Sequence, residues 1–222
     1  MPGLQRLKVR RGALLALMVL TGVRVAPADS PAEPLRATIT PVFGQLVMFS
    51  LPPEFKSQKP TYEKNSGSFY IREQVADGET RSKWTRMITL TGTRGLTANP
   101  AATPQALLAR MTAGFQRNCP DSFSSAAPGA QKVDGYDAYA VIASCGRLQS
   151  DTQTFSESAI MLTVKGSNDY YTLQWTERGR DSAQPLPIDV AYWTKQLARL
   201  NPIRLCPVVP GESAPYPSCA RH

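Results

Sequence analysis

The sequence predicts an α+β fold in which an antiparallel β-sheet is flanked by helices. Several segments alternate apolar and polar residues, which is the pattern of a strand with one buried face. Two other segments repeat apolar residues at helical spacing. The stretches 156–165 and 169–176 flank the short turn Gly166-Ser167-Asn168, which indicates a β-hairpin. In 169–176 the residues Tyr171, Leu173 and Trp175 share one face, as expected in a half-buried antiparallel sheet.

Turn and breaker residues separate the expected strands. The first strand, 43–51, is stopped by Pro52-Pro53, and the second, 68–75, is closed by the turn Asp77-Gly78. A loop rich in Ser, Ala, Pro and Gly is expected over 122–130. The remaining strands are expected at 84–91, at 136–145 after Asp134-Gly135, at 156–165 and at 169–176.

Two amphipathic helices complete the predicted elements. The first begins at Thr103-Pro104, because a threonine cap followed by proline at the first helical position is a helix-start signal. It should end before Pro120, and the second helix should cover about 188–200. The apolar stripes are Leu107, Leu108, Met111 and Phe115 in the first helix, and Val190, Trp193, Leu197 and Leu200 in the second.

The first 28 residues have the parts of a secretory signal peptide. A basic region precedes the apolar run 12–23, and Ala26-Pro27-Ala28 offers a small-residue cleavage site. Twelve apolar residues are too few to cross a bilayer, which takes about 20. We therefore expect cleavage before Asp29, a periplasmic or secreted mature protein, and no integral membrane segment in it. An uncleaved anchor or a buried helix is the alternative interpretation.

The rest of the chain is expected to hold one domain. A flexible N-terminal segment is expected over 29–42, a single α+β domain over 43–200, and a proline-rich, disulfide-stapled tail over 201–222. The whole chain carries a net charge of +8, but five basic residues and no acidic one lie in 1–28, which leaves +3. A weakly basic mature chain does not support nucleic-acid binding.

The four cysteines are an even set in a chain expected to be exported, which favours disulfides. Three pairings are possible, and we favour the sequence-local pairs Cys119–Cys145 and Cys206–Cys219. The alternatives are a metal site and a redox centre. No two cysteines form a CxxC pair and no histidine lies near them, so neither a metal ion nor another cofactor is expected.

The composition disfavours most enzymatic mechanisms. The only histidine is His222, so an interior imidazole base for a serine or cysteine nucleophile is missing. The chain has no GxGxxG, P-loop or EF-hand motif. A pair of carboxylates about 5–9 Å apart in a cleft remains possible, and would indicate a hydrolase acting on glycans.

Basic and aromatic residues gather in two places that could contact a partner. Trp, Tyr and Arg concentrate at the energetic centres of interfaces, so we expect an anionic or protein partner there. The alternative is that Trp84 belongs to the core, that the charges form a solvated rim, and that the tail is a C-terminal clasp. The candidate residues are Arg81, Lys83, Trp84 and Arg86, then Arg178 and Arg180 after the aromatic strand, and Tyr216 in the tail.

The order of several short motifs resembles that of the PsbP-like superfamily. They are Phe49-Ser50-Leu51-Pro52, Asp77-Gly78, Trp84 to Met87, Val133-Asp134-Gly135-Tyr136, and Trp175. The resemblance implies a PsbP-like sandwich, an antiparallel sheet flanked by helices. It also implies an accessory or binding role, since members of the superfamily resemble one another in being mostly non-catalytic.

We therefore expect an exported, non-enzymatic accessory or binding protein that acts through a protein-partner surface. The alternatives are the carboxylate-dependent hydrolase acting on glycans and an immunity-type inhibitor of a secreted toxin.

Overall fold

The structure is a computed structural model that describes residues 36–57, 59–150 and 153–220. The expected signal peptide, 1–28, and His222 lie outside these residues. The described residues form antiparallel sheets and a few helices, in agreement with the α+β class. They fall within a single contact unit, Glu33–His222. Among them, no helix combines the length and the apolar character that a membrane span requires.

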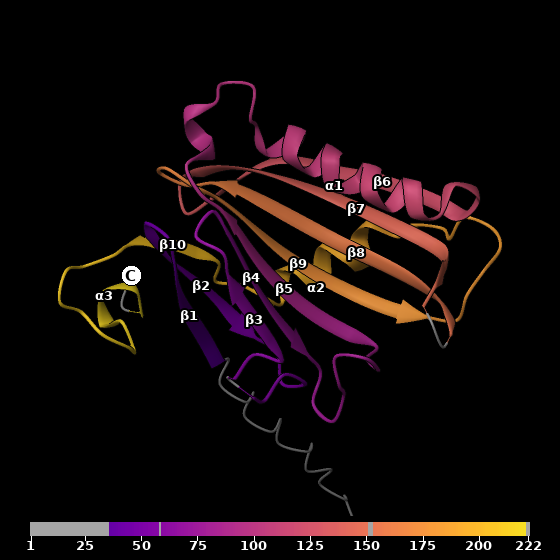
Figure 1. Cartoon of the computed structure of the whole chain (residues 1–222), viewed down its shortest axis with the longest axis horizontal. Coiled ribbons are helices and arrows are strands. Elements are labelled where there is room, and N and C mark those ends of the chain that lie inside the picture. Colours follow the sequence, from indigo (N-terminus) through magenta and orange to yellow (C-terminus); the bar gives the residue numbers. More distant parts are fainter. Residues whose placement is uncertain (1–35, 58, 151–152, 221–222) are drawn as a thin grey trace, which may run out of the picture. The chain divides into compact units, whose positions relative to one another are not determined.

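Seven antiparallel strands form the larger sheet, in the order β3-β4-β5-β9-β8-β7-β6 (Figure 1). The two longest strands, β7 and β8, lie side by side, and β6 and β3 are the edges. The strands are β3 (Tyr62–Asn65), β4 (Phe69–Val75), β5 (Arg86–Thr93), β6 (Phe123–Val133), β7 (Tyr136–Gln149), β8 (Thr154–Lys165) and β9 (Tyr170–Gly179).

Tight turns fix the register of this sheet. The expected β8–β9 hairpin is confirmed, with Lys165 opposite Tyr170. Asp134 and Gly135 join β6 to β7 with φ of 51° and 83°. Positive φ at both central residues defines a type I′ turn, whose twist suits a hairpin. The expected loop over 122–130 is therefore wrong, because β6 occupies most of it as the partner of β7.

A smaller sheet has the order β1-β2-β10, formed by β1 (Arg36–Val42), β2 (Gln45–Leu51) and β10 (Arg204–Pro207). The flexible segment expected over 29–42 is wrong for residues 36–42, which form β1; residues 29–35 lie outside the described part. Main-chain pairing of β10 with β2 holds the tail, in addition to its disulfide.

The first helix begins at its expected cap, and the second is shorter than the expected range of about 188–200. The Thr103 side chain accepts a hydrogen bond from the Ala106 N–H at 3.0 Å, and α1 (Pro104–Asn118) ends before Pro120. Asp189 caps α2 (Val190–Ala198) in the same way through the Tyr192 N–H. Val190, expected in the apolar stripe of this helix, is 42 % exposed because it lies in the first turn, beyond the core. The short helices are η1 (Leu96–Ala98), η2 (Pro120–Ser122) and α3 (Pro217–Ala220).

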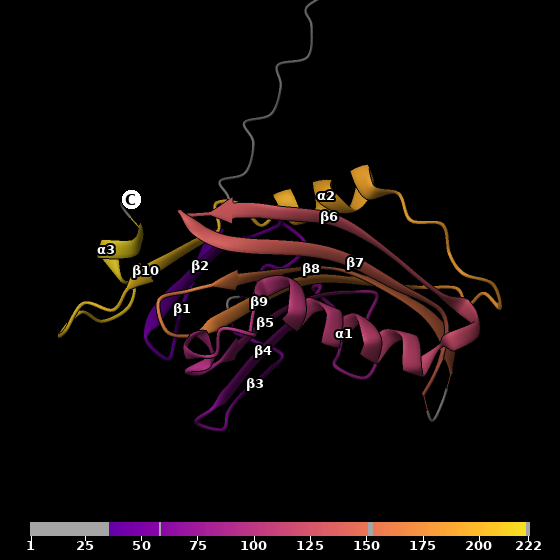
Figure 2. The same cartoon turned by 90° about the horizontal axis from the view of Figure 1, so that it is seen from above.

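The larger sheet has a different hydrophobic cluster on each face. Trp175, Leu162 and Leu197 belong to the main cluster, which α2 and the smaller sheet share. Leu108 of α1 packs on the other face, against Val141 and other residues of β7 and β8. Figure 2 shows α1 and α2 on opposite sides of β6 and β7.

Strand β9 differs from the half-buried strand that its alternation predicted. Residues 170–173 are buried on both faces. Polar side chains on the second face bond to each other there, for example the hydroxyls of Thr163 and Thr172 at 2.7 Å. Such pairing offsets the free-energy cost of desolvating the hydroxyl groups, so a face with polar side chains can be buried.

Two disulfides link the sequence-local pairs that the spacing favoured. Cys119 is joined to Cys145, and Cys206 to Cys219, with Cα atoms 5.6 Å apart in each pair. The first ties the C-terminus of α1 to β7. The second closes the tail beside Leu46 and Met48 of β2.

Candidate functional site

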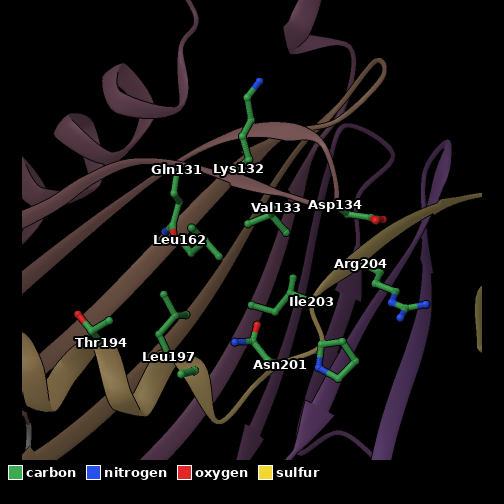
Figure 3. A pocket seen from close by; sticks show the side chains of 12 residues that line it. Gln131, Lys132, Val133, Asp134, Leu162, Thr194, Leu197, Asn201, Ile203 and Arg204 are labelled. Atoms are coloured by element: carbon green, nitrogen blue, oxygen red, sulfur yellow. The ribbon is translucent and has the colours of Figure 1, made fainter. Parts of the chain in front are cut away.

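A groove of about 520 Å³ lies between α2 and the end of β6 (Figure 3). Three segments far apart in the sequence form it: the end of β6, Leu162 of β8, and the chain from Thr194 to Arg204. Its apolar lining consists of Val133, Leu162, Leu197, Ala198, Pro202 and Ile203. A hollow with this lining can bury an aliphatic side chain of a bound molecule.

Three uncharged polar side chains border the apolar lining. Figure 3 shows Gln131 reaching from β6 towards Leu162, and Asn201 beside Ile203. An amide both donates and accepts hydrogen bonds, so these two residues can orient a bound polar group. The Thr194 hydroxyl is already engaged, since it donates to the Val190 carbonyl at 2.8 Å.

The charged residues of the groove are mostly committed to neighbours. Lys132 donates to Asp137 at 2.6 Å, and this bond holds the pKa of the Asp137 carboxyl below its usual range. Asp134 accepts a hydrogen bond from the Leu205 main chain at 3.1 Å. The Arg204 guanidinium has one buried nitrogen, Nη1, without a hydrogen-bond partner among the described residues. Asp134 is the single acid lining the groove, so a carboxylate pair is not available from its lining.

A second cavity, of about 460 Å³, lies on the α1 side of the same strand. Pro104 at the start of α1 borders it, together with Tyr139 of β7. Gln131 and Lys132 line both this cavity and the groove, so the end of β6 separates two hollows.

The structure brings three of the predicted interface residues together. Lys83, Trp84 and Arg178 line a cleft of about 440 Å³. The Arg178 guanidinium lies 3.8 Å from the ring centroid of Trp84 and 4.0 Å from that of Phe155, and its Nε donates to Glu157 at 2.8 Å. Trp84 is 8 % exposed. The tryptophan and arginine are thus bound largely to each other.

The other predicted interface residues lie elsewhere. Arg81 stacks over the Tyr62 ring, with its guanidinium carbon 3.8 Å from the ring centroid. Arg86 contacts Glu54 at 3.2 Å, while Arg180 is exposed after β9. Tyr216 is half-buried and packs against the Cys206–Cys219 cluster, as expected for a clasp rather than a displayed side chain.

The groove was missed in the sequence for a physical reason. Aliphatic and amide residues are common everywhere, and only the folded chain brings 131–134, Leu162 and 194–204 to one place. The Asp134-Gly135 turn was the one available signal, since it could have identified the preceding residues as a strand.

No cluster of metal-binding side chains occurs within the described ranges. The groove, the α1-side cavity and the Trp84 cleft are each lined by one acidic residue: Asp134, Asp137 and Glu79, respectively.

No family model matches the chain, and a search of curated proteins finds no match. A similar solved structure is that of LpqN from Mycobacterium tuberculosis, described as involved in cell envelope biogenesis. The match has a TM-score of 0.36 and 10 % sequence identity, and covers 78 % of this chain and 92 % of LpqN. A likeness of this size carries no information about function.

Proposed function

We propose that the mature protein is an exported, non-enzymatic binding protein that holds a segment of a partner protein in the groove between α2 and β6. The observation that carries this proposal is the groove itself, with its aliphatic lining and its two amides, Gln131 and Asn201. Such a lining suits an apolar side chain whose neighbouring polar groups need hydrogen bonds.

Two further features support export and a PsbP-like sandwich as parts of this proposal. Disulfides persist in oxidising compartments, and both cysteine pairs are bonded. An antiparallel sheet with helices on it is the arrangement that the PsbP-like resemblance implies. Mass spectrometry of the exported protein should find two disulfides and a new amino terminus at Asp29.

Site-specific photocrosslinking tests the groove. Ala198 and Lys195 are both exposed residues of α2, but only Ala198 lines the groove. We expect p-benzoylphenylalanine at position 198 to form a discrete adduct in cells that export the protein, and the same group at position 195 to form none. Adding Thr194→Trp, which fills the mouth of the groove, should abolish the adduct. Equal adducts from both positions, or an adduct indifferent to the filling residue, contradict the proposal.

A further inference from the structure

Part of the edge strand β6 directs main-chain hydrogen-bonding groups away from the sheet. In a type I′ hairpin the residues that flank the turn, Val133 and Tyr136, form a hydrogen-bonded pair. Hydrogen-bonded and non-hydrogen-bonded pairs alternate along an antiparallel ladder. Lys132 and Ala130, which oppose Asp137 and Tyr139, are therefore members of non-hydrogen-bonded pairs. Their N–H and C=O groups point outwards, and none of the hydrogen bonds between described residues uses them.

The first half of β6 is protected from pairing with another chain, and the second half is not. Pro128 has no N–H group, and the register with β7 shifts between Ala126 and Gly129. The Ser124 hydroxyl donates to the Leu186 carbonyl at 2.7 Å, so the segment before α2 is fastened beside the start of β6. Proline, bulges and covering segments are the usual means of blocking a sheet edge. None of these three features lies in the part of β6 that lines the two cavities, which begins at Ala130.

The two cavities lie on opposite faces of the open half of β6. Val133 faces the main cluster that α2 shares, whereas Ala130 opposes Tyr139, which packs against the α1 cluster. Successive side chains of a strand point to opposite faces. A strand paired with this edge would therefore place its side chains alternately in the groove and in the α1-side cavity.

We infer that the partner binds by strand addition, with an extended segment of its chain paired to residues 129–133 of β6. This inference rests on the proposed function and specifies its binding mode. Outward main-chain groups need a complementary main chain, and pockets on alternate faces select its side chains. The partner's side chains that enter the groove are aliphatic, since Leu162, Leu197 and Ile203 line it. The partner's side chains on the α1 side meet a mixed lining, since Ala138 and Tyr139 as well as the Lys132–Asp137 pair border that cavity, and threonine, with a methyl and a hydroxyl group, suits it.

Amide hydrogen exchange, followed by NMR, tests the pairing directly. The probes are four peptides, Ac-Thr-X-Thr-X-Thr-NH2 with X as Leu, Ile, Val or Phe, at millimolar concentration. The control peptides have the same compositions without the alternation. We expect at least one alternating peptide to slow exchange about tenfold or more at the outward amides of Ala130 and Lys132. Exchange at Gln131 and Val133, whose amides already face β7, should stay unchanged. No added protection with any of the four peptides overturns strand addition.

A matched pair of variants at one position separates main-chain from side-chain effects. Ala130→Pro removes the outward N–H and leaves the ladder to β7 intact, whereas Ala130→Val keeps the N–H. The proline variant should bind the alternating peptide at least tenfold more weakly, and the valine variant within about twofold of the parent. If Ala130→Pro fails to fold, the protection pattern of the parent protein decides.

The crosslinking experiment distinguishes the two levels of the proposal. A discrete adduct at position 198 together with normal peptide binding by Ala130→Pro means that the groove binds a partner but not by strand addition. Absence of any adduct at position 198 in the otherwise unchanged protein contradicts the proposed function itself.

Discussion

Leu108 should be the residue that anchors α1 to the larger sheet. It is fully buried, and it is the one residue of α1 that reaches this degree of burial. Its side chain packs against Val141, Ala143, Ala159 and Met161 of β7 and β8. The neighbouring Leu107 is only half-buried. The pair therefore offers the same substitution, to alanine, at an anchoring and at a peripheral position of one helix.

The expected cost of Leu108→Ala follows from its burial. Leucine to alanine removes the equivalent of about three methylene groups, worth about 2.4 kcal/mol of transfer free energy. The cavity left in a sheet-backed site adds to this, which gives about 3–4 kcal/mol in the free energy of unfolding. In a chain of this size such a loss lowers Tm by about 6–15 °C. Leu107→Ala should cost about 1 kcal/mol.

Urea unfolding of the disulfide-bonded protein, monitored by circular dichroism, measures both changes. The slope of the transition should stay the same in both variants, because the native fold is kept. A loss below about 1.5 kcal/mol for Leu108→Ala, or equal losses in the two variants, would show that α1 is not anchored in this way.

Three further perturbations test other parts of the fold. Arg178→Lys should lower the free energy of unfolding by about 1–2 kcal/mol and change the fluorescence of Trp84, because a lysine ammonium cannot stack as a planar guanidinium does; an unchanged spectrum refutes the stacking. Cys119→Ser should cost about 3.5 kcal/mol by the loop-closure argument, and thermal unfolding that is unaltered by the change contradicts it. Burial and the hydrogen bond to Glu177 raise the pKa of Tyr192 to about 12, so the folded state holds the phenol proton more tightly than the unfolded state does. The resulting contribution to the free energy of unfolding is complete below pH of about 10 and is lost as the pH rises towards 12. Absorbance titration at the phenolate band should therefore show one late-titrating tyrosine fewer in Tyr192→Phe than in the parent protein, and equal late-titrating amplitudes contradict the raised pKa of Tyr192.

Local chemistry predicted much of the framework correctly. The start of α1 at Pro104, its end before Pro120 and the β8–β9 hairpin each depend on a few neighbouring residues. Caps and tight turns satisfy backbone groups within one short segment, so the same signals act before and after folding. The sequence-local disulfides belong to this group, because each links positions close along the chain.

Strands with little apolar pattern were missed. β6 consists largely of small and polar residues, since one edge and much of its surface face solvent, and its strand conformation comes from pairing with β7. β10 is short and lies in a proline-rich stretch, and only its pairing with β2 makes it a strand. Hydrogen-bonded partners distant in the sequence cannot be identified from one segment alone.

In the candidate site, too, local sequence identified single residues but not the contacts between them. Trp84 and Arg178 were singled out separately, but their stacking arises from the pairing of β5 with β9, which no local pattern reports. The groove is assembled from three segments whose residues are unremarkable individually.

The sequence by itself favoured the cysteine pairs and located the start of α1 and the tight turns of this protein, because each depends on contacts between residues near one another in the chain. The tertiary structure alone decided which strand lies at the edge, which faces are covered and where the cavities lie. Those features depend on contacts between distant segments, and these contacts contribute no stabilising free energy until the sheet has formed.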